Sequence, residues 1–252
     1  MAMEICRLCN TQADLQRSHI VPSSVLKSVK AGESQLYVFE ENTKPIYRNV
    51  DPKEKLFCRD CEQFLSSSYE QYGTDLTKNP KNVSKSQEHI QFKKFDYKKW
   101  YLYHLSILWR ASISSLREFS GIELGGFDLV CQQCILRNDL HLDGSVSLDD
   151  VIGITMFRVI DKSDRIEDKA IKNIMLSPVR VDDSDDVLFF FMANGFLVQY
   201  RLNKNQVEQL RYQKTRRTDL DRNMHRFVRK LDITESTFLV DNFNWLINTV
   251  KS

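Results

Sequence analysis

The sequence lacks any apolar run of about 18 residues, the length that would suggest a membrane-spanning helix. Its longest apolar stretches, around 102–108 and 187–193, are long enough only for core elements. The first residues, Met-Ala-Met-Glu-Ile, carry neither the basic flank nor the hydrophobic region of a secretory signal. We therefore expect a cytoplasmic protein that has no membrane partner.

Internal repeats and low-complexity tracts are also lacking, and neither sign of charge dominates. The 252 residues hold 36 Lys and Arg against 34 Asp and Glu, a net charge of +2. This balance excludes a polycation built along its whole length for nucleic acid. Basic residues are nevertheless concentrated in 78–110 and 201–230, and acidic residues in 139–186. Such separation predicts distinct positive and negative surface regions, although solvated helix faces often carry similar runs.

Six cysteines are present, and four of them form two C-x-x-C pairs separated by about 50 residues. In a reducing cytosol, thiols are metal ligands or buried groups rather than disulfides. Two such pairs supply four thiolates to one tetrahedral zinc ion, and an all-thiolate site holds a fold rather than performing catalysis. We therefore predict a structural zinc site made by Cys6, Cys9, Cys58 and Cys61.

A third C-x-x-C pair, Cys131 with Cys134, is followed by His141 but has no fourth ligand nearby. The residues around it share an apolar helical pattern: Phe127, Leu129, Val130, Ile135 and Leu136. Cysteine packs in such surroundings as a small hydrophobic side chain. We interpret this pair as buried thiols.

The segment between the two zinc pairs contains Ser18-His19-Ile20-Val21-Pro22, and Glu62 directly follows the last cysteine of the second pair. This arrangement resembles the HNH nucleases, a family with a ββα-metal, treble-clef zinc fold. The resemblance covers roughly the first quarter of the chain. It implies that His19 deprotonates the water that attacks a phosphodiester bond. The alternative is a histidine that only hydrogen-bonds across the module.

The resemblance also implies a catalytic metal ion, Mg²⁺ or Mn²⁺, held by the residue before the histidine and the residue after the last cysteine. These residues are Ser18 and Glu62 here. The carboxylate of Glu62 suits either ion, whereas the Ser18 hydroxyl is a weak neutral ligand. A further family histidine is replaced by Ser66, and Glu70 on the same helical face is either a support for the site or a solvated residue.

Nucleic acid is the partner that a nuclease of this kind requires. Arg17 and Arg59 lie beside the two motif segments and are the nearest candidates for phosphate contacts, unless they are ordinary exposed charges. The basic run 211–217 is equally well interpreted as a nucleic-acid contact, an acidic-partner contact or a solvated loop.

We divide the chain into a zinc module over 1–76, a linker or loop over 77–89, and an α+β domain over 90–252. The module should contain a short helix at 23–29, strands at 36–39 and 46–50, and a closing helix at 62–76 whose last turn Gly73 weakens. The sequence of the second part predicts helices at 97–119, 127–136, 164–172 and 238–250, and strands at 151–160, 174–181, 187–193 and 196–202. Asn194-Gly195 between the last two strands is a strong hairpin signal.

The fold class that we expect is therefore α+β, with a zinc module followed by a helical segment, an antiparallel sheet and a C-terminal helix. The leading functional hypothesis is a divergent HNH-like nuclease acting on DNA or RNA, resembling effectors of bacterial anti-phage defence, with a C-terminal domain that binds a partner or an activating signal. One alternative is a zinc-stabilised adaptor or regulator whose catalytic site has been lost. Another is a toxin that needs a separate activator.

Overall fold

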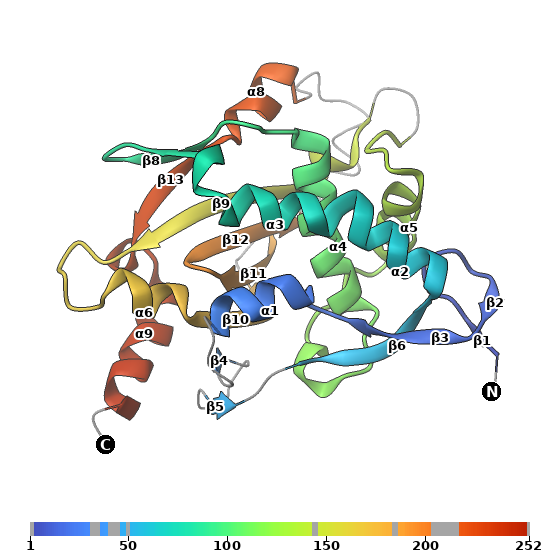
Figure 1. Cartoon of the computed structure of the whole chain (residues 1–252), viewed down its shortest axis with the longest axis horizontal. Helices are drawn as coiled ribbons and strands as arrows, with labels where there is room; N and C mark the ends of the chain where they lie inside the picture. The colour runs from blue at the N-terminus through green and yellow to red at the C-terminus, as the bar shows by residue number, and fades with distance from the viewer. Residues whose placement is uncertain are drawn as a thin grey trace.

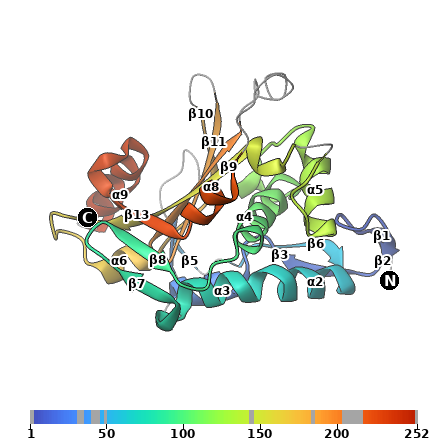
Figure 2. The same ribbon diagram turned by 90° about the horizontal axis from the view of Figure 1, so that it is seen from above.

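The computed structural model describes residues 3–30, 36–39, 46–48, 51–142, 146–182, 186–202 and 217–250. Its centre is a mixed sheet of nine strands in the order β5-β4-β10-β11-β12-β9-β13-β8-β7. The long helix α4 (Tyr97–Ser112) lies against one face of the sheet, and α9 (Thr237–Val250) lies against the other, as Figures 1 and 2 show. None of the helices in the described ranges has the length and apolarity that a membrane crossing requires.

The middle of the sheet comes from four consecutive strands, β9 (Ile152–Ile160), β10 (Ile174–Asp182), β11 (Val187–Ala193) and β12 (Phe196–Leu202). Strands β11 and β12 form the predicted hairpin, and its two turn residues both have positive φ, 53° at Asn194 and 73° at Gly195. Two adjacent residues in this conformation make the turn whose twist matches that of the flanking strands.

Alternation along β11 divides the core into two layers. Phe189 and Phe191 belong to the large cluster that includes α4, whereas Phe190 and Met192 face the smaller cluster that includes α9. Successive side chains of a strand point to opposite faces, so a strand covered on both sides is apolar throughout. This explains why 187–193 is one of the longest apolar stretches of the sequence.

The prediction of an antiparallel sheet is wrong in two places. Strand β4 (Leu36–Phe39) pairs in parallel with β10, and β13 (Phe227–Asp232) pairs in parallel with β9. Three strands flank these: β5 (Ile46–Arg48) pairs with β4, while β8 (His89–Phe92) and β7 (Val83–Lys85) extend the sheet beyond β13. The sheet therefore includes strands from 1–76, from 77–89 and from 90–252.

The front of the chain forms two small antiparallel sheets, β1 (Glu4–Ile5) with β2 (Gln12–Ala13) and β3 (Leu15–His19) with β6 (Lys53–Cys58). Helix α1 (Ser23–Lys30) follows β3. Helix α2 (Arg59–Leu65) follows β6 at once and continues through the π-helical segment η1 (Ser66–Glu70) into α3 (Gln71–Lys78). The expected closing helix is thus present, and it begins three residues earlier than predicted.

Shorter elements complete the described chain. They are the helices α5 (Phe127–Arg137), α6 (Asp168–Lys172) and α8 (Asp219–Met224) and the 3₁₀ turns η2 (Pro80–Asn82), η3 (Arg117–Phe119), η4 (Leu148–Asp150) and η5 (Ile233–Glu235). The helix predicted over 97–119 ends at Ser112. The one predicted over 164–172 begins at Asp168.

The front module packs closely on α4. The Phe57 and Trp109 rings stack with centroids 5.6 Å apart. Gly73 of α3 lies against the ring of Tyr103, and a Cβ atom at this position would be 2.5 Å from Tyr103 Cε1. Gly73 is therefore required by the approach of two helices, which its low helix propensity alone does not reveal.

Replacing Gly73 by alanine should lower the free energy of unfolding by about 1–3 kcal/mol, because the buried Tyr103 ring must move to admit the methyl group. The matched control is Gly126→Ala, since a Cβ at Gly126 has no neighbour within 4 Å in the part of the chain that the structure describes. Chemical denaturation of both variants measures the difference. Equal stabilities of the two variants would contradict the close helix contact.

Candidate metal centre and adjoining polar site

The four front cysteines come together as predicted. The sulfur atoms of Cys6, Cys9, Cys58 and Cys61 all lie within 4.8 Å of one another. Cys9 Sγ and Cys58 Sγ are 3.8 Å apart, and four sulfurs bound at about 2.3 Å to one tetrahedral zinc would be separated by about 3.8 Å. The cluster is therefore consistent with a zinc-binding module. In the described ranges, no other group of three or more His, Cys, Asp or Glu residues has this geometry.

The backbone around Cys6 and Cys9 is folded to present both thiols. The Cys6 N–H donates to the carbonyl of Thr11 at 2.9 Å, and the Asn10 N–H donates to the carbonyl of Cys6 at 2.9 Å. Asn10 has a φ of 59°, a left-handed conformation that asparagine tolerates well. The Cys58 N–H donates to Cys6 Sγ at 3.3 Å, so the two cysteine pairs are bonded to each other directly.

Helix α5 fixes this turn from outside the module. The Gln132 side chain donates from Nε2 to the carbonyls of Arg7 and Leu8, at 2.6 and 3.1 Å. Gln132 lies between Cys131 and Cys134, which are both fully buried, and burial raises the pKa of each thiol, that of Cys134 to about 11. The interpretation of the third C-x-x-C pair as buried thiols is confirmed.

His19 is the last residue of β3 and is held by a carboxylate. Its Nε2 lies 3.0 Å from Oδ1 of Asp51, and the other carboxylate oxygen, Oδ2, is 2.6 Å from Lys53 Nζ. Burial lowers the pKa of His19 below its usual value, and the charge of Asp51 only partly opposes that shift. A neutral ring that donates from Nε2 to a carboxylate has Nδ1 left as its proton acceptor.

Ser18 and Glu62 also lie together, although they come from β3 and from the first turn of α2. Ser18 is 1% exposed, and its hydroxyl donates to the carbonyl of Gln16 at 3.3 Å. Burial raises the pKa of Glu62, and a hydrogen bond with Ser18 and the positive charge of Arg110 partly oppose that shift. The structure thus places both predicted catalytic-metal ligands at the junction of β3 and α2.

Sequence reasoning missed Arg110 and Asp51. Arg110 is 3% exposed on α4, and its Nη2 lies 2.6 Å from Oε1 of Glu70 while its Nη1 donates to the carbonyl of His19 at 3.1 Å. A charged residue inside an otherwise apolar helical stripe was the signal that could have identified Arg110. Asp51 lies in a polar stretch without periodicity, which offered no comparable signal.

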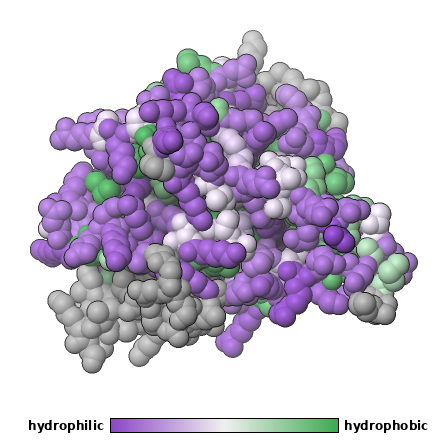
Figure 3. Space-filling view, viewed as in Figure 1, coloured by the Kyte–Doolittle hydropathy of each residue, from purple (hydrophilic) through white to green (hydrophobic). Residues whose placement is uncertain are grey.

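An open groove of about 640 Å³ adjoins this polar site. It runs between α1 and the helix formed by η1 and α3, and its lining includes Ser23, Ser24, Ser66, Glu70 and Thr74. Figure 3 shows the face that carries α1 and α3 as mainly hydrophilic, with neutral residues gathered near its middle. Arg17 and Arg59 are both exposed, and their assignment as phosphate contacts stays a prediction. The basic residues 211–216 lie outside the described residues.

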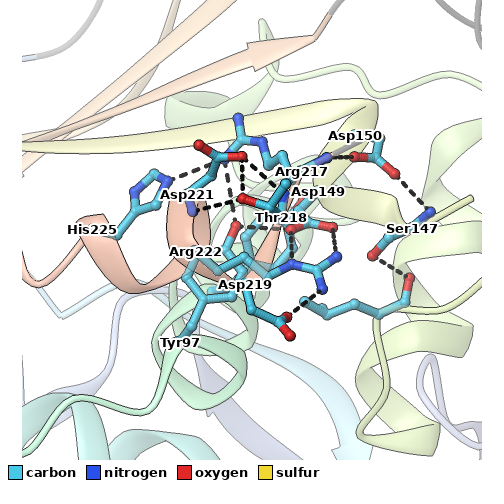
Figure 4. Close-up of polar contacts among 12 residues, drawn as sticks. Tyr97, Ser147, Asp149, Asp150, Arg217, Thr218, Asp219, Asp221, Arg222 and His225 are labelled. Carbon is cyan, nitrogen blue, oxygen red and sulfur yellow. Dashed lines mark hydrogen bonds and ion pairs between the residues drawn. The ribbon is translucent and has the colours of Figure 1, made fainter. Parts of the chain in front are cut away.

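A second polar cluster lies beside α8, remote in sequence from the four front cysteines. The Asp149 side chain is fully buried, and it accepts hydrogen bonds from Tyr97 Oη at 3.0 Å and from Arg222 Nε at 3.0 Å. Arg217 Nη1 contacts His225 Nε2 at 3.1 Å, as Figure 4 shows. A pocket of about 380 Å³ adjoins Tyr97 and Arg222. The internal ion pairing of Asp149 explains its burial without a ligand.

Comparison of the sequence with models of protein families, with curated proteins and with solved structures gives no match.

Proposed function

We propose that this chain is a divergent HNH-like nuclease, in which a structural zinc ion bound by four thiolates supports a site that hydrolyses phosphodiester bonds. Two observations support the proposal: His19 is anchored to Asp51 at the end of β3, and its neighbour Ser18 is hydrogen-bonded to Glu62 in the first turn of α2. The antiparallel pair β3–β6 followed at once by α2 is also the local topology that a ββα-metal site requires.

In this proposal, each residue has a separate role. His19 accepts a proton from water through Nδ1, while Asp51 holds the ring through Nε2. Glu62, with Ser18 as a weak neutral partner, would hold Mg²⁺ or Mn²⁺, because such an ion needs only one or two carboxylates in addition to phosphate and water. The bound ion would supply charge stabilisation at the phosphate and at the leaving oxygen. Nucleic acid is the proposed partner, with Arg17 and Arg59 as exposed phosphate contacts.

The rival function, a zinc-stabilised adaptor, is favoured by one observation. The Ser18 side chain is almost completely buried and already hydrogen-bonded to Gln16 and Glu62, so it resembles a structural residue more than an exposed ligand. An adaptor would bind nucleic acid or protein and leave phosphodiester bonds intact.

The test uses the full chain with supercoiled DNA and with RNA, in the presence of Mg²⁺, Mn²⁺ or a chelator. We expect metal-dependent cleavage that falls by about 10²–10⁴-fold in His19→Ala, because the general base is lost. The control is His141→Ala, since His141 is exposed in the loop after α5. Binding without cleavage under every metal would contradict the nuclease and support the adaptor.

A further inference from the structure

Arg110 links the two halves of the proposed site from a different part of the chain. It belongs to α4, yet it bonds to residues 91 and 40 positions earlier, the His19 carbonyl at 3.1 Å and the Glu70 carboxylate at 2.6 Å. The His19 carbonyl belongs to the main chain that carries the proposed base. Arg110 therefore determines where β3 ends with respect to η1.

Glu70 is placed by an irregularity of its helix. It is the last residue of the π-helical segment η1, which interrupts the α-helical hydrogen bonding between α2 and α3. A π-helical turn is rare and is frequently found at functional sites, where it changes the direction in which a side chain points. Glu70 is 20% exposed and lines the open groove, so one side of its carboxylate meets Arg110 and the other meets solvent.

Space filling alone does not account for a guanidinium in this position. Burying an arginine carries a desolvation cost that an apolar side chain of similar size avoids. This cost is larger here because Arg110 Nε is buried and has no hydrogen-bond partner among the described residues. An apolar residue could not form the two bonds that Arg110 makes, one to the main-chain carbonyl of His19 and one to the carboxylate of Glu70 on another element.

Building on the proposed nuclease function, we propose that Arg110 and Glu70 form a positioning pair for the phosphodiester reaction. The Arg110 guanidinium fixes the main chain at His19, so that the imidazole is held at a constant distance from Glu62. Glu70 fixes the guanidinium in turn, from its position on the wall of the open groove. Neither residue exchanges a proton or contacts the reacting atoms in this proposal.

The test compares Arg110→Lys with Arg158→Lys in the full chain. Arg158 is a matched control because it is also buried, donates to the carbonyls of Val159 and Gly195, and pairs with the carboxylate of Asp168, far from the site. A lysine cannot span two partners as a guanidinium does. We expect kcat to fall about 10- to 100-fold in Arg110→Lys with KM little changed, and both constants to be unaffected in Arg158→Lys. Glu70→Gln should give a smaller loss of kcat and serves if Arg110→Lys does not fold.

A second measurement separates this inference from the nuclease proposal. The ring resonances of His19 in an NMR spectrum report its position whether or not the chain cleaves nucleic acid. We expect them to shift in Arg110→Lys and in Glu70→Gln, and to match the wild-type positions in Arg158→Lys. Unchanged His19 resonances, or a wild-type kcat in a folded Arg110→Lys chain, would overturn the positioning role. A wild-type chain that cleaves nothing would instead overturn the nuclease proposal and leave the resonances to decide the role of Arg110.

Discussion

Replacing Cys58 and Cys61 together by serine is expected to remove one bound zinc ion per chain and to unfold the front module. The four sulfur atoms lie within 4.8 Å of one another, so without an ion the module retains a cluster of thiols with few favourable contacts among them. A structural zinc site contributes binding free energy of about 10 kcal/mol or more, and that free energy is also folding free energy. Elemental analysis measures the ion, and thermal unfolding with and without a chelator measures the stability.

The third C-x-x-C pair provides the matched control for this experiment. Cys131→Ala with Cys134→Ala also removes two cysteines three positions apart, but both thiols are buried in packing contacts of α5. We expect this variant to lose stability through the small cavities that it creates, and to retain one zinc per chain. Zinc loss from the control, or zinc retention after replacement of Cys58 and Cys61, would contradict the assignment of the ligands.

Acidification below pH 6.5 is expected to destabilise the fold through His104. Its ring is 4% exposed against Trp100 and Tyr103, and burial lowers its pKa to about 3. Because the folded pKa lies below the unfolded value of about 6.5, the unfolded chain takes up the proton first. The contribution of neutral His104 to the free energy of unfolding is complete above pH 6.5. It is lost as the pH falls toward 3, at up to about 1.4 kcal/mol per pH unit.

The measurement is a series of urea unfolding curves between pH 7 and pH 4 for the wild type and for His104→Leu. The difference between the two chains removes the contribution of the carboxylates to the pH dependence, because they titrate in the same range in both. We expect the stability of the wild type to fall more steeply, by up to about 1.4 kcal/mol per pH unit. His225, whose pKa burial lowers to about 4, contributes in the same direction and is present in both chains. Parallel curves would show that His104 is not buried as a neutral ring.

Local signals allowed much of the fold to be predicted. The Asn194-Gly195 turn specified its own conformation, and the strands on either side of it have the predicted bounds. The α+β class and the C-terminal helix are confirmed for the same reason, because the apolar patterns that produce them lie within single elements. The parallel pairing of β4 with β10 could not be predicted, because its partners are far apart in sequence and a parallel pair has no turn of its own.

The candidate site was only partly predictable for a related reason. The zinc-binding cysteine pairs can be recognised from their spacing, because a tetrahedral ion needs four ligands and two short loops supply them. The two residues that hold His19 in place, Asp51 and Arg110, follow no such spacing pattern. Asp51 lies two residues before β6, whose pairing with β3 sets Lys53 opposite His19. Arg110 belongs to a helix whose apolar pattern indicates only a core element.

The pairing of β4 with β10 has a consequence for the synthesis of this protein. Cys9 and Cys58 are 49 residues apart, and the chain between them contributes β4 and β5 to the large sheet. All four thiols therefore leave the ribosome well before the strand that β4 needs as its neighbour. Zinc capture by the nascent chain would fold the front module early, whereas a metal-free module would stay unfolded until β10 is made, and unfolded segments with unpaired strands aggregate. Scarcity of the metal should accordingly reduce the yield of newly made chains more than it affects chains that have already folded.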